Sequence, residues 1–517
     1  MSFCTVLSAA VQGLSVEMIR VEADVSNGLP MFHMVGYLSS EVKEASERVR
    51  TAIRNSGMKL PAKKIIVNLA PATVRKRGAS FDLPIALAVL AAMNYVPEEA
   101  LKGVAVIGEV SLEGKIRGVS GVLPIVMEAK NQGCTACILP EENEIEGRLV
   151  SGIKILPADN LEKLCAYLNG DEKEIHRKKQ GRSSAQRNIF ENKKEDFSDI
   201  CGQNAVKRAA EIAVAGGHNL LMAGPPGSGK SMIARRIATI LPELSLEESL
   251  EITRIYSVLG MIDKEQPLIT RRPFRSVHHT ITKTALVGGG MTPRPGEISM
   301  AHGGVLFLDE LAEFPRNVLE VLRQPLEEHQ IHIARNYGNF TFPAEFMLVA
   351  AMNPCPCGNY PDMQKCSCTP SQIQKYLGKI SQPFLDRMDL CIETPKVEYR
   401  ELDIERIGKK EEESSEVIRS RVVEARKLQK KRYEGTQIRT NSMLGPGEIR
   451  TYIPLGSAEG KLMEKAFERM GLTARTYHKI LRVARTIADL DYSEKVTEKH
   501  LKEAIAYRSL DKKYWGR

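Results

Sequence analysis

Apolar positions in the first third of the chain follow two different periods. Residues 13–25 and 64–68 alternate or run without interruption, which predicts β-strands, whereas residues 39–55 repeat at helical spacing. A further apolar helix is expected to end near Met93. We also expect a hairpin over residues 108–116 and another helix that begins at Gly121. This alternation predicts a self-contained α/β domain over residues 1–168.

Residues 171–195 interrupt the alternation, because they are rich in Lys, Arg, Glu, Ser and Gln and contain few apolar positions. We therefore predict a linker over residues 169–195. Its basic side chains could contact DNA phosphates, although a charged run of this kind is more often simply solvated. These side chains are Arg177, Lys178, Lys179, Arg182 and Arg187.

Strands and helices alternate again over residues 196–395, which predicts a second α/β domain. Apolar runs at residues 220–223, 304–308 and 346–352 are expected to form buried strands. Residues 396–517 are instead predicted to be helical. Within residues 474–490, apolar side chains recur three and four positions apart, as on one face of a helix.

Composition limits the class of protein. The chain has 517 residues, of which 43% are hydrophobic and 26% charged, as in ordinary globular proteins. The formal net charge of +9 permits an anionic partner such as nucleic acid without requiring one. Residues 1–6 lack the basic start of a signal peptide, and the longest apolar stretch, residues 83–93, is shorter than the ~18 residues of a membrane helix. We therefore expect a cytoplasmic protein with no membrane partner, whose ten cysteines are reduced thiols or metal ligands.

A phosphate-binding loop is predicted directly after the strand at residues 220–223. The spacing G-x-x-x-x-G-K-[ST] between a strand and a helix lets backbone N–H groups surround the phosphates of ATP. The lysine of such a loop reaches the β- and γ-phosphates, and the hydroxyl that follows it binds Mg²⁺. The loop consists of Gly224, Pro225, Pro226, Gly227, Ser228, Gly229, Lys230 and Ser231.

Polar residues at the ends of the next two apolar strands supply further catalytic candidates. Asp309 is expected to hold Mg²⁺, and Glu310 to polarise the attacking water. Asn353 can orient that water, although Asn before Pro is also an ordinary start of a turn. Arg387 suits an arginine finger that reaches the nucleotide of a neighbouring subunit, or it could simply pair with Asp386 or Asp389.

Four of the ten cysteines fall within fourteen residues, in two C-x-C pairs. Zn²⁺ accepts four thiolates at tetrahedral geometry, so we predict a structural zinc site on Cys355, Cys357, Cys366 and Cys368, with a packed or redox-labile loop as the alternative. His278 and His279 form a weaker metal candidate, because adjacent histidines point in different directions. For them, anion contact or core packing is favoured.

These motifs together resemble the AAA+ ATPases and, more narrowly, the magnesium-chelatase-like YifB/ComM family. The resemblance rests on residues 216–221, 294–298, 353–358 and 385–390 and covers nearly the whole chain. It implies a P-loop AAA+ core with β-hairpin insertions, followed by an α-helical lid. The resemblance also implies a role for each candidate residue. Lys230 and Ser231 would belong to Walker A, Asp309 and Glu310 to Walker B, and Asn353 would be sensor 1, Arg387 the arginine finger and Arg475 sensor 2.

Arg475 lies in the first turn of its predicted helix, where the helix dipole favours an acidic residue. A bound phosphate would explain an arginine there. We therefore expect Arg475 to join the phosphate loop of its own subunit.

The first domain resembles the proteolytic domain of Lon proteases, a ribosomal S5 domain 2-like fold. Ser80 falls at the position of the catalytic serine in that pattern, but Leu123 occupies the position of its lysine partner. A serine hydroxyl without a base is a weak nucleophile. We therefore expect a Lon-like fold without peptidase activity.

The function favoured by the resemblance is a ring of six subunits that uses ATP to move single-stranded and branched DNA in recombination and natural transformation. A hairpin predicted around Tyr337-Gly338 would line its pore, with Arg335 contacting phosphate or, alternatively, forming a surface salt bridge. Two other functions stay open: a protein-remodelling ATPase of the magnesium-chelatase type, and an ATP-dependent peptidase.

Overall fold

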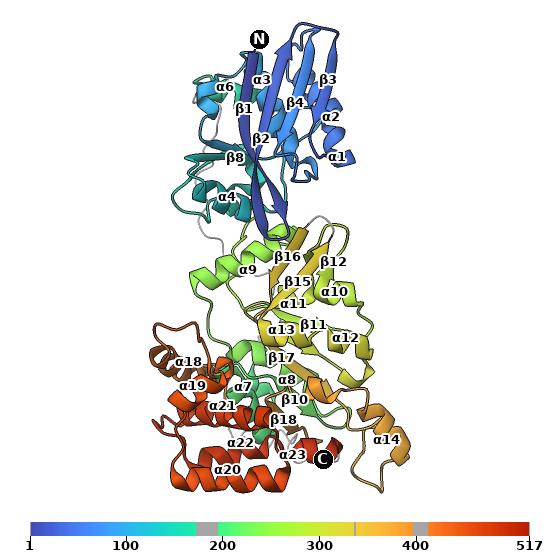
Figure 1. The fold of residues 1–517 in the computed structure, drawn as a ribbon, viewed down its shortest axis with the longest axis vertical. Helices are drawn as coiled ribbons and strands as arrows, with labels where there is room; N and C mark the ends of the chain where they lie inside the picture. The colour runs from blue at the N-terminus through green and yellow to red at the C-terminus, as the bar shows by residue number, and fades with distance from the viewer. Residues whose placement is uncertain (1, 172–194, 336–337, 397–411, 516–517) are drawn as a thin grey trace.

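The structure is a computed structural model that describes residues 2–171, 195–335, 338–396 and 412–515. Most of the predicted linker lies outside the described residues, including Arg177, Lys178, Lys179, Arg182 and Arg187, and so does Tyr337. Figure 1 shows the N-terminal unit at one end of the long axis and the second unit next to it, with the C-terminal helices packed around the far part of the second unit.

The first unit is a seven-stranded mixed sheet with the strand order β3-β4-β2-β1-β5-β8-β9. Its strands are β1 (Ser2–Gln12), β2 (Ser15–Ser26), β3 (Met31–Val35), β4 (Lys64–Ala70), β5 (Val104–Val106), β8 (Ala136–Pro140) and β9 (Lys154–Ala158), with the small hairpin β6 (Glu109–Val110) and β7 (Ile116–Arg117) at one end. Its helices are α1 (Ser40–Lys43), α2 (Ala45–Asn55), α3 (Asp82–Ala92), α4 (Val122–Asn131), α5 (Glu144–Gly147) and α6 (Leu161–Leu168).

Alternating side chains of β1 enter two separate cores. Val6 packs in the cluster that contains α3, whereas Ala9 packs in the cluster that contains α4. The two helices therefore cover opposite faces of the sheet. The sequence pattern predicted β2, β4, α3 and α4 but missed β1, and the helix expected over residues 39–55 is divided at Glu44 into α1 and α2.

The second unit is a five-stranded parallel sheet with the order β11-β14-β17-β10-β18. Its strands are β10 (Leu220–Ala223), β11 (Phe274–Val277), β14 (Val305–Leu308), β17 (Met347–Met352) and β18 (Leu390–Glu393). The helices around it are α7 (Asn204–Gly216), α8 (Lys230–Ile237), α9 (Leu246–Leu259), α10 (Lys283–Val287), α11 (Glu297–Met300), α12 (Arg316–Glu320), α13 (Arg323–Glu328), α14 (Pro370–Leu377) and α15 (Gln382–Leu385). The three buried strands predicted from apolar runs are β10, β14 and β17.

Two hairpins extend from the second unit toward the first (Figure 1). One pairs β12 (Gly288–Gly289) with β13 (Arg294–Pro295), and the other pairs β15 (Gln330–Arg335) with β16 (Gly338–Pro343), where the sequence predicts a hairpin. The turn between β1 and β2 lies against the second hairpin, because a Cβ on Gly13 would be 3.1 Å from Phe340 Cδ1 and 3.4 Å from Phe342 Cε1. One face of this hairpin is therefore buried by the first unit.

A buried carboxylate also joins the first two units. Glu146 of α5 accepts hydrogen bonds from the Ser257 hydroxyl of α9 at 2.6 Å and from the Leu123 backbone N–H at 2.8 Å. Burial raises the pKa of Glu146 above its usual range. Because both hydrogen bonds satisfy the same buried group, they fix α4, α5 and α9 relative to one another.

The third unit consists of helices that pack against the second sheet. They are α18 (Ser415–Arg432), α19 (Pro446–Tyr452), α20 (Ser457–Met470), α21 (Ala474–Leu490), α22 (Glu498–Ala506) and α23 (Ser509–Trp515). Lys479 of α21 pairs with Asp389 at 3.0 Å, and Thr486 of α21 lies 2.8 Å from His218 Nε2. None of the described helices is both long and apolar enough to cross a lipid bilayer.

Candidate nucleotide site

The phosphate loop connects β10 to α8, as its spacing predicts. Gly229 precedes α8 with φ of +81°, a backbone conformation that glycine adopts without the clash of a side chain. Gly224 begins the loop against the Thr394 carbonyl, and Gln203 Nε2 donates to the Ser228 carbonyl at 2.9 Å. The loop is therefore held from both sides, with the N-terminus of α8 directed at the space that phosphates would occupy.

Lys230 folds onto the loop that it is expected to serve. Its Nζ donates to the carbonyls of Gly224 and Pro225 at 2.8 Å and lies 3.3 Å from both Ser228 Oγ and Asn353 Oδ1. Burial lowers the pKa of Lys230 to about 8, because desolvation disfavours the ammonium form. A bound triphosphate would favour the ammonium form of Lys230 and replace the carbonyl partners.

Oxygen ligands for Mg²⁺ lie together at the same edge of the sheet. The Ser231 hydroxyl donates to Asp309 Oδ2 at 2.6 Å, which joins the first turn of α8 to the end of β14. Hydroxyl and carboxylate oxygens are ligands that Mg²⁺ prefers. Both predicted magnesium ligands are therefore close enough to hold one ion.

Glu310 follows Asp309 in the left-handed region of backbone space, with φ of +52°. Its exposed carboxylate lies 3.3 Å from His279 Nδ1, just after β11. A strained backbone at a strand end often marks a functional residue. His279 therefore contacts the predicted catalytic carboxylate, while its ring packs edge-on against the buried Phe314, with the ring centroids 6.4 Å apart.

Arg387 lies at the opposite edge of the sheet from the phosphate loop. We call the edge where strands β10, β14 and β17 end the carboxyl edge, and the edge where β10 and β18 begin the amino edge. Arg387 lies two residues before Asp389, which is the last residue before β18. The Asp389 N–H donates to the carbonyl of Asn219, which is the last residue before β10. Because β10 is four residues long, about 13 Å separates the two edges.

Glu327 of α13 brings the two predicted arginines together. Arg387 Nη2 lies 2.6 Å from Glu327 Oε1, and Arg475 Nη2 lies 3.7 Å from the same oxygen. Arg387 also donates to the Pro383 carbonyl at 2.6 Å and is only 7% exposed, whereas the Arg475 side chain is 63% exposed. Asp386 and Asp389, the alternative partners, bond to Gln382 and Lys479 instead.

This arrangement differs from one expectation from the sequence, in which Arg475 joins the phosphate loop of its own subunit. In the structure Arg475 shares a carboxylate with Arg387 at the amino edge, and its role toward a nucleotide stays a prediction. The physical reason is the position of α21, which Lys479 ties to Asp389 beside Arg387. The sequence pattern identifies this helix but not the edge of the sheet that it covers.

Arg335 is exposed near the end of β15. Its Nε donates to the Gly290 carbonyl at 3.4 Å, and Nη1 donates to the neighbouring Ala334 carbonyl at 3.0 Å. Among the described residues no carboxylate pairs with it, so the salt-bridge alternative finds no partner there. Arg335 thus links the two hairpins.

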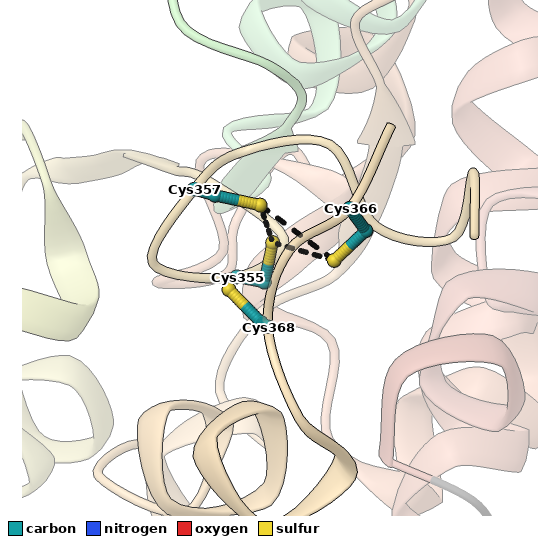
Figure 2. Close-up of side chains that lie close together, drawn as sticks. All are labelled: Cys355, Cys357, Cys366 and Cys368. Carbon is teal, nitrogen blue, oxygen red and sulfur yellow. Dashed lines mark hydrogen bonds between the residues drawn. The ribbon is translucent and has the colours of Figure 1, made fainter. Parts of the chain in front are cut away.

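The four clustered cysteines converge, as Figure 2 shows. The Sγ atom of Cys355 lies 3.4 Å from that of Cys357 and 3.8 Å from that of Cys366. The Cys357–Cys366 distance is 3.6 Å, and the four sulfurs, including that of Cys368, all lie within 4.8 Å of one another. The Asn359 backbone N–H helps lower the pKa of Cys357 to about 5, which favours a thiolate. This cluster could hold a metal ion.

Leu123, at the position of the lysine in the Lon pattern, is fully buried in α4. Ser80 lies just before α3, where its carbonyl accepts from the Gly108 N–H at 3.0 Å. An aliphatic side chain cannot act as a base. This geometry agrees with the expectation of a Lon-like unit without peptidase activity, which stays a prediction.

Sequence reasoning missed two residues that contact the predicted catalytic groups, His279 beside Glu310 and Glu327 between the arginines. In the sequence, His279 belongs only to a weak metal motif with His278. Nothing in the local sequence around Glu327 distinguishes it from an ordinary helical surface glutamate. Both depend on tertiary packing.

Three family models match the chain. Residues 196–402 match magnesium chelatase, subunit ChlI; residues 21–143 match subunit ChlI of Mg-chelatase; and residues 412–508 match magnesium chelatase, subunit ChlI C-terminal. These matches span all three units.

Individual proteins are similar over nearly the full length. The chain is 44% identical to YifB of Escherichia coli over 512 residues, covering 99% of this chain and 98% of that protein. It is 42% identical to the competence protein ComM of Haemophilus influenzae over 517 residues, with the same coverage. It is also 26% identical to the Lon protease of Trichlorobacter lovleyi over 160 residues, covering 29% of this chain and 19% of that protein.

Proposed function

The chain belongs to the YifB/ComM family of magnesium-chelatase-like proteins, and from this premise we propose that it is a ring-forming ATPase that moves DNA. The ring, of six subunits, couples ATP hydrolysis to translocation and branch migration during recombination and natural transformation. The observation that carries the proposal is the division of the candidate site between two edges of one sheet, because such a site is completed only by a second subunit.

The carboxyl edge binds the nucleotide. Lys230 would exchange its loop carbonyls for the β- and γ-phosphates, and Ser231 and Asp309 would hold Mg²⁺. The ion would neutralise charge on the phosphates when bound. Asn353, whose Oδ1 lies beside Lys230 Nζ, orients the attacking water, and Glu310 accepts its proton. His279 fixes the Glu310 carboxylate.

The amino edge supplies the neighbouring subunit's site. Arg387 is too far from the phosphate loop of its own subunit, so it acts in trans as the arginine finger. Arg475 lies beside it and acts in trans too. Both guanidiniums exchange Glu327 for the γ-phosphate, because a phosphate carries more charge and more acceptor oxygens than one carboxylate.

The two hairpins contact DNA. They lie together near the first unit, and Arg335 is exposed between them. An exposed guanidinium with carbonyl partners can pair with a phosphate without first breaking an ion pair. The formal net charge of +9 adds a general attraction to nucleic acid.

A second candidate function is a protein-remodelling ATPase, which the magnesium-chelatase family models favour. It uses the same nucleotide site without DNA. ATP turnover separates the two functions: single-stranded and branched DNA should each stimulate phosphate release in low salt, and Arg335→Ala should weaken that stimulation more than the surface control Arg117→Ala. If no DNA form binds or stimulates turnover, the motor proposal fails and remodelling is favoured.

The cofactors of this proposal are ATP and Mg²⁺ at the carboxyl edge and a structural Zn²⁺ on the four clustered cysteines.

A further inference from the structure

We propose that the zinc-bound cysteine loop holds the phosphate loop in place, so that nucleotide binding depends on the metal. The cysteine loop comprises residues 355–368. The inference rests on the proposed ATP site but not on DNA movement. It makes the metal a support of the nucleotide site rather than a distant structural cross-link.

The sulfur positions fit a tetrahedral metal. With Zn–S bonds near 2.3 Å, the sulfurs of a zinc site are separated by about 3.8 Å. The separations of 3.4, 3.6 and 3.8 Å among the sulfurs of Cys355, Cys357 and Cys366 lie close to this value. They are too long for a disulfide bond, whose sulfurs lie about 2.05 Å apart.

Hydrogen bonds from the loop already support the sulfurs. The Tyr360 N–H donates to Cys355 Sγ at 3.4 Å, and Asn359 Nδ2 donates to Cys357 Sγ at 4.0 Å. Such outer partners orient the ligands of metal sites. Cys355 is buried and the other three cysteines are half-buried, which leaves the site accessible to an incoming ion.

The cysteine loop packs directly on the phosphate loop. A Cβ on Gly358 would lie 2.3 Å from Pro226 Cδ and 3.1 Å from Pro226 Cγ. Gly358 follows Cys357 directly, and Asn353 precedes Cys355 by two residues. Any change in the shape of the cysteine loop is therefore passed to Pro226 and Asn353.

A second set of contacts leads to the first residue of the phosphate loop. The Tyr360 ring lies 6.0 Å from the ring of Tyr514, whose hydroxyl donates to Glu393 Oε1 at 2.7 Å. The next residue, Thr394, places its carbonyl so close to Gly224 that a Cβ there would be 2.2 Å away. The cysteine loop thus supports the phosphate loop from two sides.

Zinc content and nucleotide affinity test whether the metal is bound and whether nucleotide binding depends on it. The full chain, purified without chelators, should contain about one zinc per subunit by elemental mass spectrometry. Cys357→Ser should lose most of it and bind a fluorescent ATP analogue about tenfold more weakly, while Cys134→Ser, in the first unit, should retain both. Chelation of wild-type protein followed by zinc addition should reproduce the loss and its recovery, even if Cys357→Ser does not fold.

Gly358→Ala tests the contact with all four cysteines in place. It should keep zinc but weaken nucleotide binding about tenfold, because the new methyl group displaces Pro226. Gly435→Ala is the matched control: Gly435 has φ of +79° against +82° for Gly358, but nothing lies within 4 Å of its added Cβ. Both variants thus carry similar backbone strain.

Three results would overturn the proposal. They are a wild-type protein with iron or no metal in place of zinc, a zinc-depleted protein with unchanged nucleotide affinity, and equal affinities for Gly358→Ala and Gly435→Ala. None of these readouts involves DNA, so a failed motor function leaves them interpretable.

Discussion

The two edges of the parallel sheet hold charged groups in opposite ways. At the carboxyl edge, Lys230, Ser231, Asp309 and Asn353 bond to one another and to the phosphate loop. At the amino edge, Arg387 and Arg475 share the single carboxylate of Glu327. The first edge is organised to bind a nucleotide by itself. The second holds two cations on a partner that a more highly charged anion can replace, and under the proposed function that anion is the γ-phosphate of a neighbouring subunit.

Mixing two inactive variants gives the largest expected effect. Lys230→Ala removes the phosphate contact, and Arg387→Ala removes the arginine finger; each alone should lower ATP turnover about 1000-fold. In an equal mixture, about a quarter of the interfaces combine an intact phosphate loop with an intact finger, so phosphate release should recover to a comparable fraction of wild type.

The mixture needs the same total protein concentration as each single variant. Lys230→Ala mixed with inactive Glu310→Gln provides the control, because both changes lie at the carboxyl edge and no interface gains an intact site. Recovery in neither mixture would show that the two edges do not meet between subunits.

Arg475 provides a second test of the same division. Arg475→Ala should lower turnover about a hundredfold and should be rescued by mixing with Lys230→Ala but not with Arg387→Ala. The reason is that Arg387 and Arg475 come from the same subunit, so no interface in the last mixture contains both arginines. Rescue by Arg387→Ala would instead place Arg475 in the site of its own subunit.

The carboxyl edge could be predicted from the sequence because its groups follow strand ends in contiguous motifs. Apolar runs identified β10, β14 and β17, and parallel strands end at one edge, which brings Lys230, Asp309 and Asn353 together. The range of α21 was predicted as well.

The amino edge could not be predicted in the same way. Glu327 lies 60 residues from Arg387, and only the packing of α21 and α13 against the sheet brings Arg475 to the same carboxylate. The contact of His279 with Glu310 likewise depends on β11 lying beside β14. The strand β1 was missed because its partners, β2 and β5, are chosen by tertiary packing.

A pH titration distinguishes the edges by their chemistry. Lys230, with its pKa lowered to about 8 by burial, must be protonated to bind the triphosphate. ATP affinity should therefore be constant below about pH 7 and fall toward tenfold per pH unit above pH 8, measured with excess Mg²⁺. Phosphate itself completes its ionisation below this window.

Lys230→Arg is the control for the titration, because a guanidinium stays charged throughout this range. Its affinity, although weaker, should show no fall between pH 7 and 9. An equal fall in both proteins would assign the titration to another group.

Glu327→Gln should give the smallest effect on ATP turnover. The direction of that effect tests whether Glu327 restrains Arg387 and Arg475 until a nucleotide binds. Glutamine keeps the shape of Glu327 but removes the charge that competes with the neighbour's γ-phosphate for Arg387 and Arg475. Because Glu327 is half exposed, each ion pair contributes no more than about 1 kcal/mol, so turnover should rise by about two- to fivefold. Glu328→Gln, on the same helix but bonded to Gln324, should leave turnover unchanged. A fall in turnover with Glu327→Gln would mean that the carboxylate positions the arginines for catalysis instead of restraining them.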